Sequence, residues 1–198
     1  MLAQPEGTST AVSSAAPRRQ LLLIAVVGEA TLGALGLAVV WWRTGRPLVS
    51  WGPLVVSMAS GTAVATAFAV VLHLVLRYAP DVWPVSPLRR TYRDVLRPLF
   101  AGVGVLDILV ISLAAGFGEE LLFRAAMQPA LGLLATSCVF GLVHVFSRDS
   151  VPLGMWAAAA GLVFGWLMTV TGGGGAPIAA PAGYDAFAPA RIPRGACA

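Results

Sequence analysis

The sequence predicts an all-α fold, a polytopic bundle of about five to six transmembrane helices. Of its 198 residues, 58% are hydrophobic and only 11% are charged, whereas an average soluble domain has about 25% charged residues. The mean hydropathy is +0.81. Apolar runs of about 20 residues, the length that spans a bilayer, recur along the chain. We therefore expect residues 18–192 to form a single transmembrane domain.

The charge pattern indicates a membrane environment. The formal net charge of +4 comes from arginine alone, because the chain contains no lysine, and most arginines lie between apolar runs. Such a distribution orients helices in a bilayer and contacts anionic lipid headgroups, so membrane lipids are expected partners and nucleic acid is not. Two widely separated cysteines, Cys138 and Cys197, do not predict a disulfide framework.

The chain begins with a small, polar segment, residues 1–17, that predicts a disordered tail. Arg18 and Arg19 then lead into an apolar run over Leu21–Trp42. Paired arginines before an apolar run also occur in twin-arginine signals, but this run is long enough to span and ends in an interfacial tryptophan anchor. Within it, Glu29 has no evident partner, and helix packing and a cavity-facing role both stay open.

A second span is predicted over Pro53–Val75, with His73 near its end as an interfacial histidine. The connector that follows, residues 77–97, is the most basic segment of the chain. By the positive-inside rule it is cytoplasmic, and after two spans the N-terminus lies on the same side. Its basic residues are Arg77, Arg89, Arg90, Arg93 and Arg97.

A third apolar segment, Leu99–Ala115, continues without a break into a pair of glutamates. Asp107 lies within it, twelve residues before Glu119. That separation is about 18 Å along a helix, so the two acids are not expected to share a site. Further apolar helices are predicted over Leu133–Phe146 and Val151–Val170.

The C-terminal part is less regular. Residues 171–175, a threonine and four glycines, predict a hinge, and the mildly apolar segment 176–188 is interrupted by prolines. A spanning helix there would be short and kinked. Residues 193–198 have no strong anchor and are expected to fray.

Chemistry is concentrated in the stretch Glu119-Glu120-Leu-Leu-Phe-Arg124. An ionisable residue at bilayer depth costs about 2.5–3.5 kcal/mol on insertion scales, so such a group usually surrounds a functional polar cavity. Glu120 and Arg124 are four residues apart and can pair on one helix face, whereas Glu119 is rotated by about 100°. The paired carboxylate then stays ionised, and Glu119 is free to accept a proton from water. The alternative is an ion pair that only locks two helices.

Phe140 and His144 form a second pair at four-residue spacing. A lone histidine on an apolar helix is more often a satisfied core residue than a ligand. However, one helix, a proline and a second helix separate His144 from Glu119. If the two helices are antiparallel neighbours, both side chains can face one cavity and deprotonate a water.

These two motifs, EExxxR at Glu119–Arg124 and FxxxH at Phe140–His144, resemble those of the CPBP family of intramembrane metalloproteases, which includes the type II CAAX prenyl proteases and bacteriocin-immunity proteins. The similarity covers about residues 89–187. It implies that Glu119 and His144 activate the hydrolytic water and that Glu120 and Arg124 order the site. It also implies a prokaryotic inner-membrane protein and a divalent metal such as zinc. Glu119 and His144 are the candidate ligands, too few for a four-ligand zinc site.

A third family motif is a late-helix histidine followed four residues later by Asn or Asp. Asp185 matches its end, but Pro181 stands at the histidine position. Proline neither binds a metal nor donates a hydrogen bond, and losing one such group typically costs on the order of 10²–10³ in rate. The resemblance thus predicts an endopeptidase acting on membrane-associated, including prenylated, peptides. The rival is a pseudoprotease that only binds membrane peptides or partner helices. A small transporter is a weaker third candidate, since only one terminal segment is broken.

Overall fold

The computed structural model describes residues 18–46, 54–100 and 103–171. Every regular element in these ranges is helical, as the sequence predicts. Within the described residues, three helices are long and apolar enough to cross a membrane: α1 (Arg18–Thr44), α2 (Leu54–Tyr78, apolar span Ala59–Tyr78) and α8 (Val151–Thr171). The all-α membrane helix bundle is confirmed, and the chain is an integral membrane protein.

A fourth long helix runs through the middle of the molecule. It consists of α5 (Val105–Glu119), the π-helical segment η2 (Glu120–Met127) and α6 (Gln128–Leu131), which follow one another directly. It ends at Gly132, whose φ of 82° a side chain would disfavour. A shorter apolar helix, α7 (Leu133–Val143), then turns back.

The helix that leads into the glutamates starts later than predicted. The sequence predicted one apolar segment from Leu99, but α4 (Arg97–Leu99) ends there and α5 starts at Val105. Gly104 is the N-cap residue, and its backbone N–H donates to Asp107 Oδ2 over 2.8 Å. A carboxylate in the first turn satisfies a free helix N–H and favours a start at this point.

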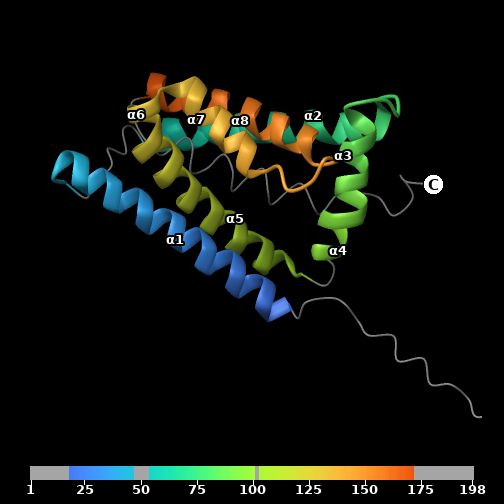
Figure 1. The fold of residues 1–198 in the computed structure, drawn as a ribbon, viewed down its shortest axis with the longest axis horizontal. Coiled ribbons are helices and arrows are strands. Elements are labelled where there is room, and N and C mark those ends of the chain that lie inside the picture. The colour runs from blue at the N-terminus through green and yellow to red at the C-terminus, as the bar shows by residue number, and fades with distance from the viewer. Residues whose placement is uncertain (1–17, 47–53, 101–102, 172–198) are drawn as a thin grey trace, which may run out of the picture.

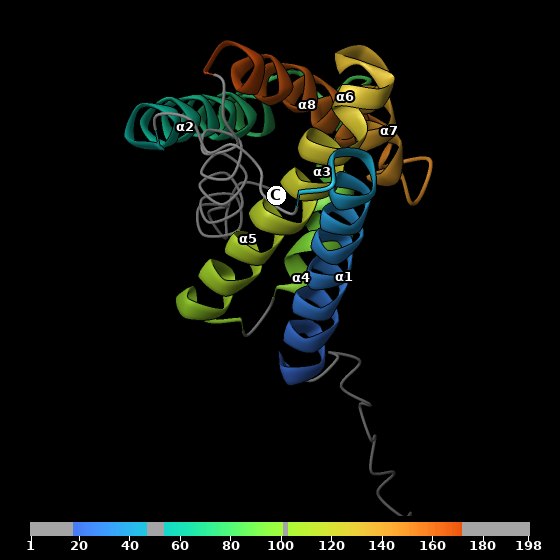
Figure 2. The same ribbon diagram turned by 90° about the vertical axis from the view of Figure 1, so that its left-hand side faces the viewer.

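Helices α1 and α5–η2 lie side by side and run in the same direction (Figure 1, Figure 2). At their first turns, Arg18 Nε and Nη2 bind Asp107 Oδ2 and Oδ1 over 2.5 and 2.7 Å. At the other end, Arg43 donates to Ala126 O over 3.0 Å. Parallel packing means that an even number of membrane crossings separates the two helix starts, which agrees with α2 as the single return span.

Small residues allow α1 and η2 to approach closely. A Cβ on Gly36 would lie 2.5 Å from the backbone carbon of Leu121 and 2.7 Å from the nitrogen of Leu122. Backbone atoms cannot yield as a flexible side chain can. In membranes, where no hydrophobic force drives helices together, such close contact is a main source of association.

We expect Gly36→Ala to destabilise the protein by about 1–3 kcal/mol, because the added methyl overpacks a backbone contact. Gly28→Ala on the same helix is the matched control, since a Cβ there meets nothing within 4 Å. Removing a helical glycine at an open position should stabilise by up to about 1 kcal/mol. Unfolding in detergent, followed by circular dichroism, measures both. Equal stability of the two variants would contradict the packing account.

Helices α7 and α8 form an antiparallel hairpin. Gly141 faces Gly154, Ser137 faces Gly161, and the side chain of Gln128 donates to Gly165 O over 3.0 Å. The order of these contacts brings the start of α8 beside the end of α7. α2 packs along α8, where the Phe68 ring lies 5.3 Å from Trp156 and 5.9 Å from Phe164.

The basic connector is helical, which its charge alone did not indicate. It comprises α3 (Val85–Thr91), the π-helical segment η1 (Tyr92–Leu96) and α4, at one end of the bundle (Figure 1). Leu88, Tyr92 and Leu96 recur every four residues and pack together with Leu72 and Leu76 of α2. The arginines of this amphipathic helix occupy the remaining positions.

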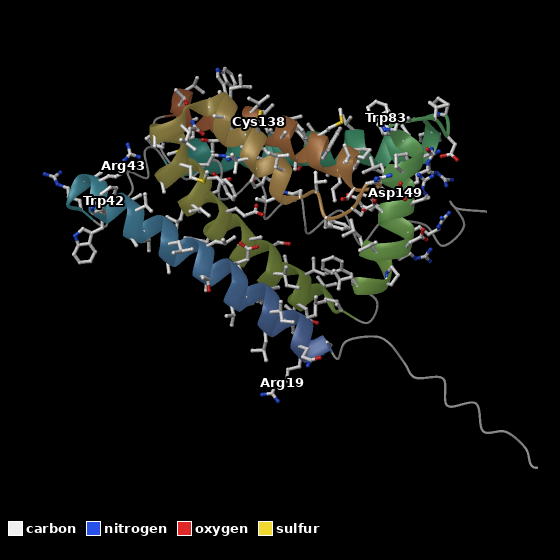
Figure 3. All side chains as sticks on the ribbon, viewed as in Figure 1. Arg19, Trp42, Arg43, Trp83, Cys138 and Asp149 are labelled. Atoms are coloured by element: carbon white, nitrogen blue, oxygen red, sulfur yellow. The ribbon has the colours of Figure 1, made fainter. Side chains whose placement is uncertain are left out.

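Arg89 joins this helix to the end of α2. Its guanidinium donates to the carbonyl oxygens of Leu76 and Ala79 over 2.9 and 2.6 Å. A cation that satisfies the last carbonyls of a helix is favourable, because those groups have no partner within the helix. Arg89 also reaches Asp81 over 3.1 Å. Trp42, the tryptophan predicted to anchor the first span, lies near one end of the molecule, and Trp83 of the connector lies near the other (Figure 3).

Candidate active site

Glu119 and Glu120 lie where the long central helix changes from α to π geometry. Helix α5 ends at Glu119, and η2 begins at Glu120. π-Helical segments occur frequently at functional sites. Consecutive residues point in different directions, so the two carboxylates have different neighbours and different exposure.

Glu120 faces Arg124 in the interior. Oε2 of Glu120 lies 3.6 Å from Nε of Arg124, and the two side chains are only 3% and 1% exposed. The guanidinium also lies 4.9 Å from the ring centroid of Phe140, a cation–π distance. Phe140 in turn packs edge-on against Phe123 at 5.0 Å. This cluster joins η2 to α7.

Glu119 faces His144 across the gap between two helices. Oε1 of Glu119 lies 3.8 Å from Nε2 of His144, with side chains that are 16% and 31% exposed. Contacts of Phe140 with Phe123, and of His144 with Glu119, show that α7 runs antiparallel to the central helix. Because Glu119 and Glu120 point in different directions on the helix, the partly exposed Glu119 meets His144, and the buried Glu120 meets Arg124.

The imidazole of His144 is oriented by its own helix. Nδ1 lies 2.7 Å from Phe140 O, and a carbonyl oxygen only accepts, so Nδ1 carries the proton. Nε2 of the neutral ring is then an acceptor on the side of Glu119. A separation of 3.8 Å is too long for a direct hydrogen bond. Both side chains are partly exposed, so the two groups can reach a single water beside them.

His144 ends its helix rather than lying inside it. The sequence predicted helix to Phe146, whereas α7 ends at Val143 with His144 as its C-cap residue. The chain then turns through Ser147–Ser150 before α8. The position of His144 consequently depends on this turn, as well as on α7.

Glu29 is a neighbour of the site that sequence reasoning did not assign. A Cβ on Gly118 would meet the backbone oxygen of Glu29 and lie 2.7 Å from its carboxylate. Oε2 of Glu29 is buried without a hydrogen-bond partner among the described residues. Glu29 thus lies on the face of α1 that contacts α5, beside the residue that precedes Glu119, which agrees with a role in helix packing. The sequence signal for this contact was Gly118, the glycine directly before the two glutamates, because a glycine lets a neighbouring helix approach closely.

The remaining predicted positions lie elsewhere. Asp107 pairs with Arg18 at the far end of α5, in agreement with its expected separation from Glu119. Asp185 and Pro181 lie outside the described residues, as does the segment 176–188, and so do the predicted tail 1–17 and end 193–198.

The described residues do not form a zinc centre. A catalytic zinc usually has three protein ligands, and no group of three or more His, Cys, Asp or Glu side chains suited to a metal occurs in residues 18–46, 54–100 and 103–171. Glu119 and His144 supply two donors, and Glu120 is occupied by Arg124. The donor set described here therefore does not fit the metal that the family resemblance implies.

Comparison with known families agrees with this arrangement of motifs. Residues 101–187 match the family model for Rce1-like type II CAAX prenyl endopeptidases. This segment is therefore similar to the CAAX prenyl endopeptidases. The match includes both glutamates, Arg124 and His144, and confirms the resemblance seen in the sequence. No curated protein and no solved structure matches the chain.

The matched segment does not stand alone in the fold. Its first helix, α5, packs against α1, and its last described helix, α8, packs against α2 and α3. Residues before position 101 thus surround the family segment on two sides. The family is one of proteases, which supports a peptidase assignment for this chain.

Proposed function

We propose that this protein is a membrane-embedded endopeptidase that hydrolyses a peptide bond of a membrane-associated substrate with glutamate-activated water. The observation that carries the proposal is the approach of Glu119 and His144 to 3.8 Å, from two helices of the matched segment. Both side chains are partly exposed, while the neighbouring pair Glu120–Arg124 is closed off. This difference in exposure suits a reactive role for Glu119 and a structural role for Glu120.

The proposed steps use only side chains of this site. Glu119 takes a proton from the water that it shares with His144, and the resulting hydroxide attacks the carbonyl carbon of the scissile bond. The tetrahedral intermediate then collapses as the protonated Glu119 gives its proton to the leaving amine. His144, fixed by Phe140 O, orients the water. Arg124, paired with Glu120, holds η2 against α7 through Phe140. The family resemblance assigns a further part in the reaction to Asp185, which lies outside the described residues.

The substrates would be peptides at the membrane, ranging from prenylated C-terminal peptides to other membrane-associated segments. The family match supports this class, and no described feature selects a prenyl group. We place the protein in a prokaryotic inner membrane with a cytoplasmic N-terminus. The basic helix over residues 85–99 would then lie at the cytoplasmic surface, in agreement with the positive-inside rule.

A second candidate function is a pseudoprotease that binds membrane peptides or partner helices without cleaving them. One observation favours it: Pro181 stands where the family has a histidine. Retention of Glu119, Glu120, Arg124 and His144 favours the enzyme, because a pure binder has little use for such costly residues in a membrane.

Substitution Pro181→His distinguishes these functions. If the protein is an enzyme in its present form, the parent cleaves a panel of fluorogenic membrane peptides in detergent, and Pro181→His changes the rate without being required. If it is a pseudoprotease, the parent shows only background cleavage, and Pro181→His raises the cleavage rate by a factor on the order of 10²–10³. Glu119→Ala in both backgrounds is the control for contaminating proteases.

A further inference from the structure

The turn that follows His144 is tied to the basic helix at the cytoplasmic end of the bundle. Arg90 Nε and Nη2 donate to Asp149 Oδ2 and Oδ1 over 3.0 and 2.9 Å. Next to it, Thr91 Oγ1 donates to the backbone oxygen of Asp149 over 2.9 Å. Figure 3 shows Asp149 at the end of the bundle where α3 lies. Two neighbouring residues of α3 therefore hold both the side chain and the backbone of one turn residue.

The inside of the same turn is organised by Ser150, which is completely buried. Its Oγ accepts from the backbone N–H groups of Phe146 and Ser147 over 2.9 and 2.8 Å, and donates to Ser147 O over 2.9 Å. The turn is thus a closed unit that begins two residues after His144. A displacement of the unit at Asp149 is transmitted to His144 through only a few residues.

His144 is held by its own helix on one side and by the turn on the other. It is the C-cap residue of α7, its side chain is 31% exposed, and Nδ1 is held by Phe140 O. The last turn of a helix frays when nothing beyond it is anchored. Here the anchor is the turn 147–150, which is held on one side by the start of α8, where Gly154 meets Gly141 and Val145, and on the other by α3.

We propose that Arg90 and Asp149 form a positioning pair, which holds the turn 147–150 against α3 and thereby keeps His144 at its distance from Glu119. The inference deepens the function proposed above and rests on it for its catalytic part. It assigns to the cytoplasmic helix a part in the reaction, although α3 lies outside the matched segment. Arg90 and Asp149 touch neither the water nor the peptide.

The pair is ionised at neutral pH. Hydrogen bonding to the Arg90 guanidinium lowers the pKa of Asp149 below its ordinary value of 3.8. A carboxylate with a lowered folded-state pKa contributes stability above its unfolded-state pKa, and loses it as the pH falls through the folded-state pKa. The contribution of Asp149 is therefore constant from about pH 5 to pH 8, and in this range the pair is intact in every protein that contains both Arg90 and Asp149.

The chain offers a matched control in Asp94. It also forms a two-oxygen pair with an arginine, over 2.7 and 3.1 Å to Arg93, and its side chain is 54% exposed against 49% for Asp149. Arg93 is its neighbour in the same helix, so this pair does not join Asp94 to the turn. Asp149→Ala and Asp94→Ala remove equivalent ion pairs, of which only one connects two elements.

Hydrogen exchange of the intact protein in detergent tests the structural part. With Asp149→Ala, the amides of Phe146 and Ser147 should exchange about two- to fivefold faster, the scale of an exposed two-oxygen pair. Asp94→Ala should leave them unchanged. The exchanged pair Arg90→Asp with Asp149→Arg should restore protection. Equal exchange in the two alanine variants would overturn the proposal.

Cleavage kinetics test the catalytic part. Asp149→Ala should lower kcat by about tenfold with little change in KM, because a misplacement of well under 1 Å suffices for such a loss. The exchanged pair should recover most of the lost kcat. The exchanged variant also has no negative charge at position 149, so loss of that charge alone cannot explain the drop in Asp149→Ala. A turn that loosens without any change in kcat would overturn the positioning role. If the parent cleaves no peptide, the proposed function fails, and the exchange experiment still decides whether the pair holds the turn.

Discussion

Glu119→Gln should abolish most peptide cleavage, with kcat lower by about 10²–10⁴-fold, the usual contribution of a general base. The amide keeps the size and shape of the side chain 3.8 Å from His144, but it cannot accept a proton from water. KM should change little, because the substrate's binding surface is intact. Steady-state kinetics with a fluorogenic membrane peptide measure both constants.

Glu29→Gln is the matched control for this result. Glu29 is also an intramembrane carboxylate, and it packs beside Gly118 on the neighbouring helix. If the loss in Glu119→Gln came only from removing a negative charge in this part of the bundle, Glu29→Gln would lose as much. We expect it to retain cleavage within about tenfold of the parent. A Glu119→Gln variant with parental kcat would remove Glu119 from the reaction.

Arg124→Leu should be strongly destabilising, by about 3–5 kcal/mol, because it leaves the buried carboxylate of Glu120 without its partner. Both side chains are nearly inaccessible, at 1% and 3% exposure. The guanidinium also packs on Phe140, and that contact is lost at the same time. Unfolding by titration with a denaturing detergent, followed by circular dichroism, measures the change.

A double variant separates the ion pair from its packing. In Glu120→Gln with Arg124→Leu, no unpaired charge remains, so much of the lost stability should return. Cleavage should stay low in the double variant if the pair also orders the site. If the stability of Arg124→Leu alone is within about 0.5 kcal/mol of the parent, the cluster of Arg124 with Glu120 and Phe140 is not the connection between η2 and α7 that we describe.

The helices and the inner part of the site follow from local patterns. Apolar runs of membrane length predict α1, α2 and α8, and a four-residue spacing predicts the contact of Glu120 with Arg124. Both depend on residues close in sequence, for which helix geometry is known in advance. The facing of Glu119 and His144 required one further assumption, that two consecutive apolar helices are antiparallel neighbours.

Contacts between distant segments could not be predicted in the same way. Arg18 and Asp107 are 89 positions apart, and no pattern in either segment indicates the other. The connector over residues 77–97 was interpreted from its arginines, although Leu88, Tyr92 and Leu96 at four-residue spacing indicate an amphipathic helix. The start of α5 at Gly104, rather than at Leu99, depends on an N-terminal contact of Asp107.

The most direct test of the central claim is the mass of the products that the purified parent protein forms from a membrane-associated peptide in water labelled with heavy oxygen. An endopeptidase of the proposed kind yields two fragments, with the label in the new carboxyl group and at a rate that Glu119→Gln removes. Intact peptide with the parent, together with cleavage by Pro181→His, would contradict the claim and indicate a protease fold that now only binds.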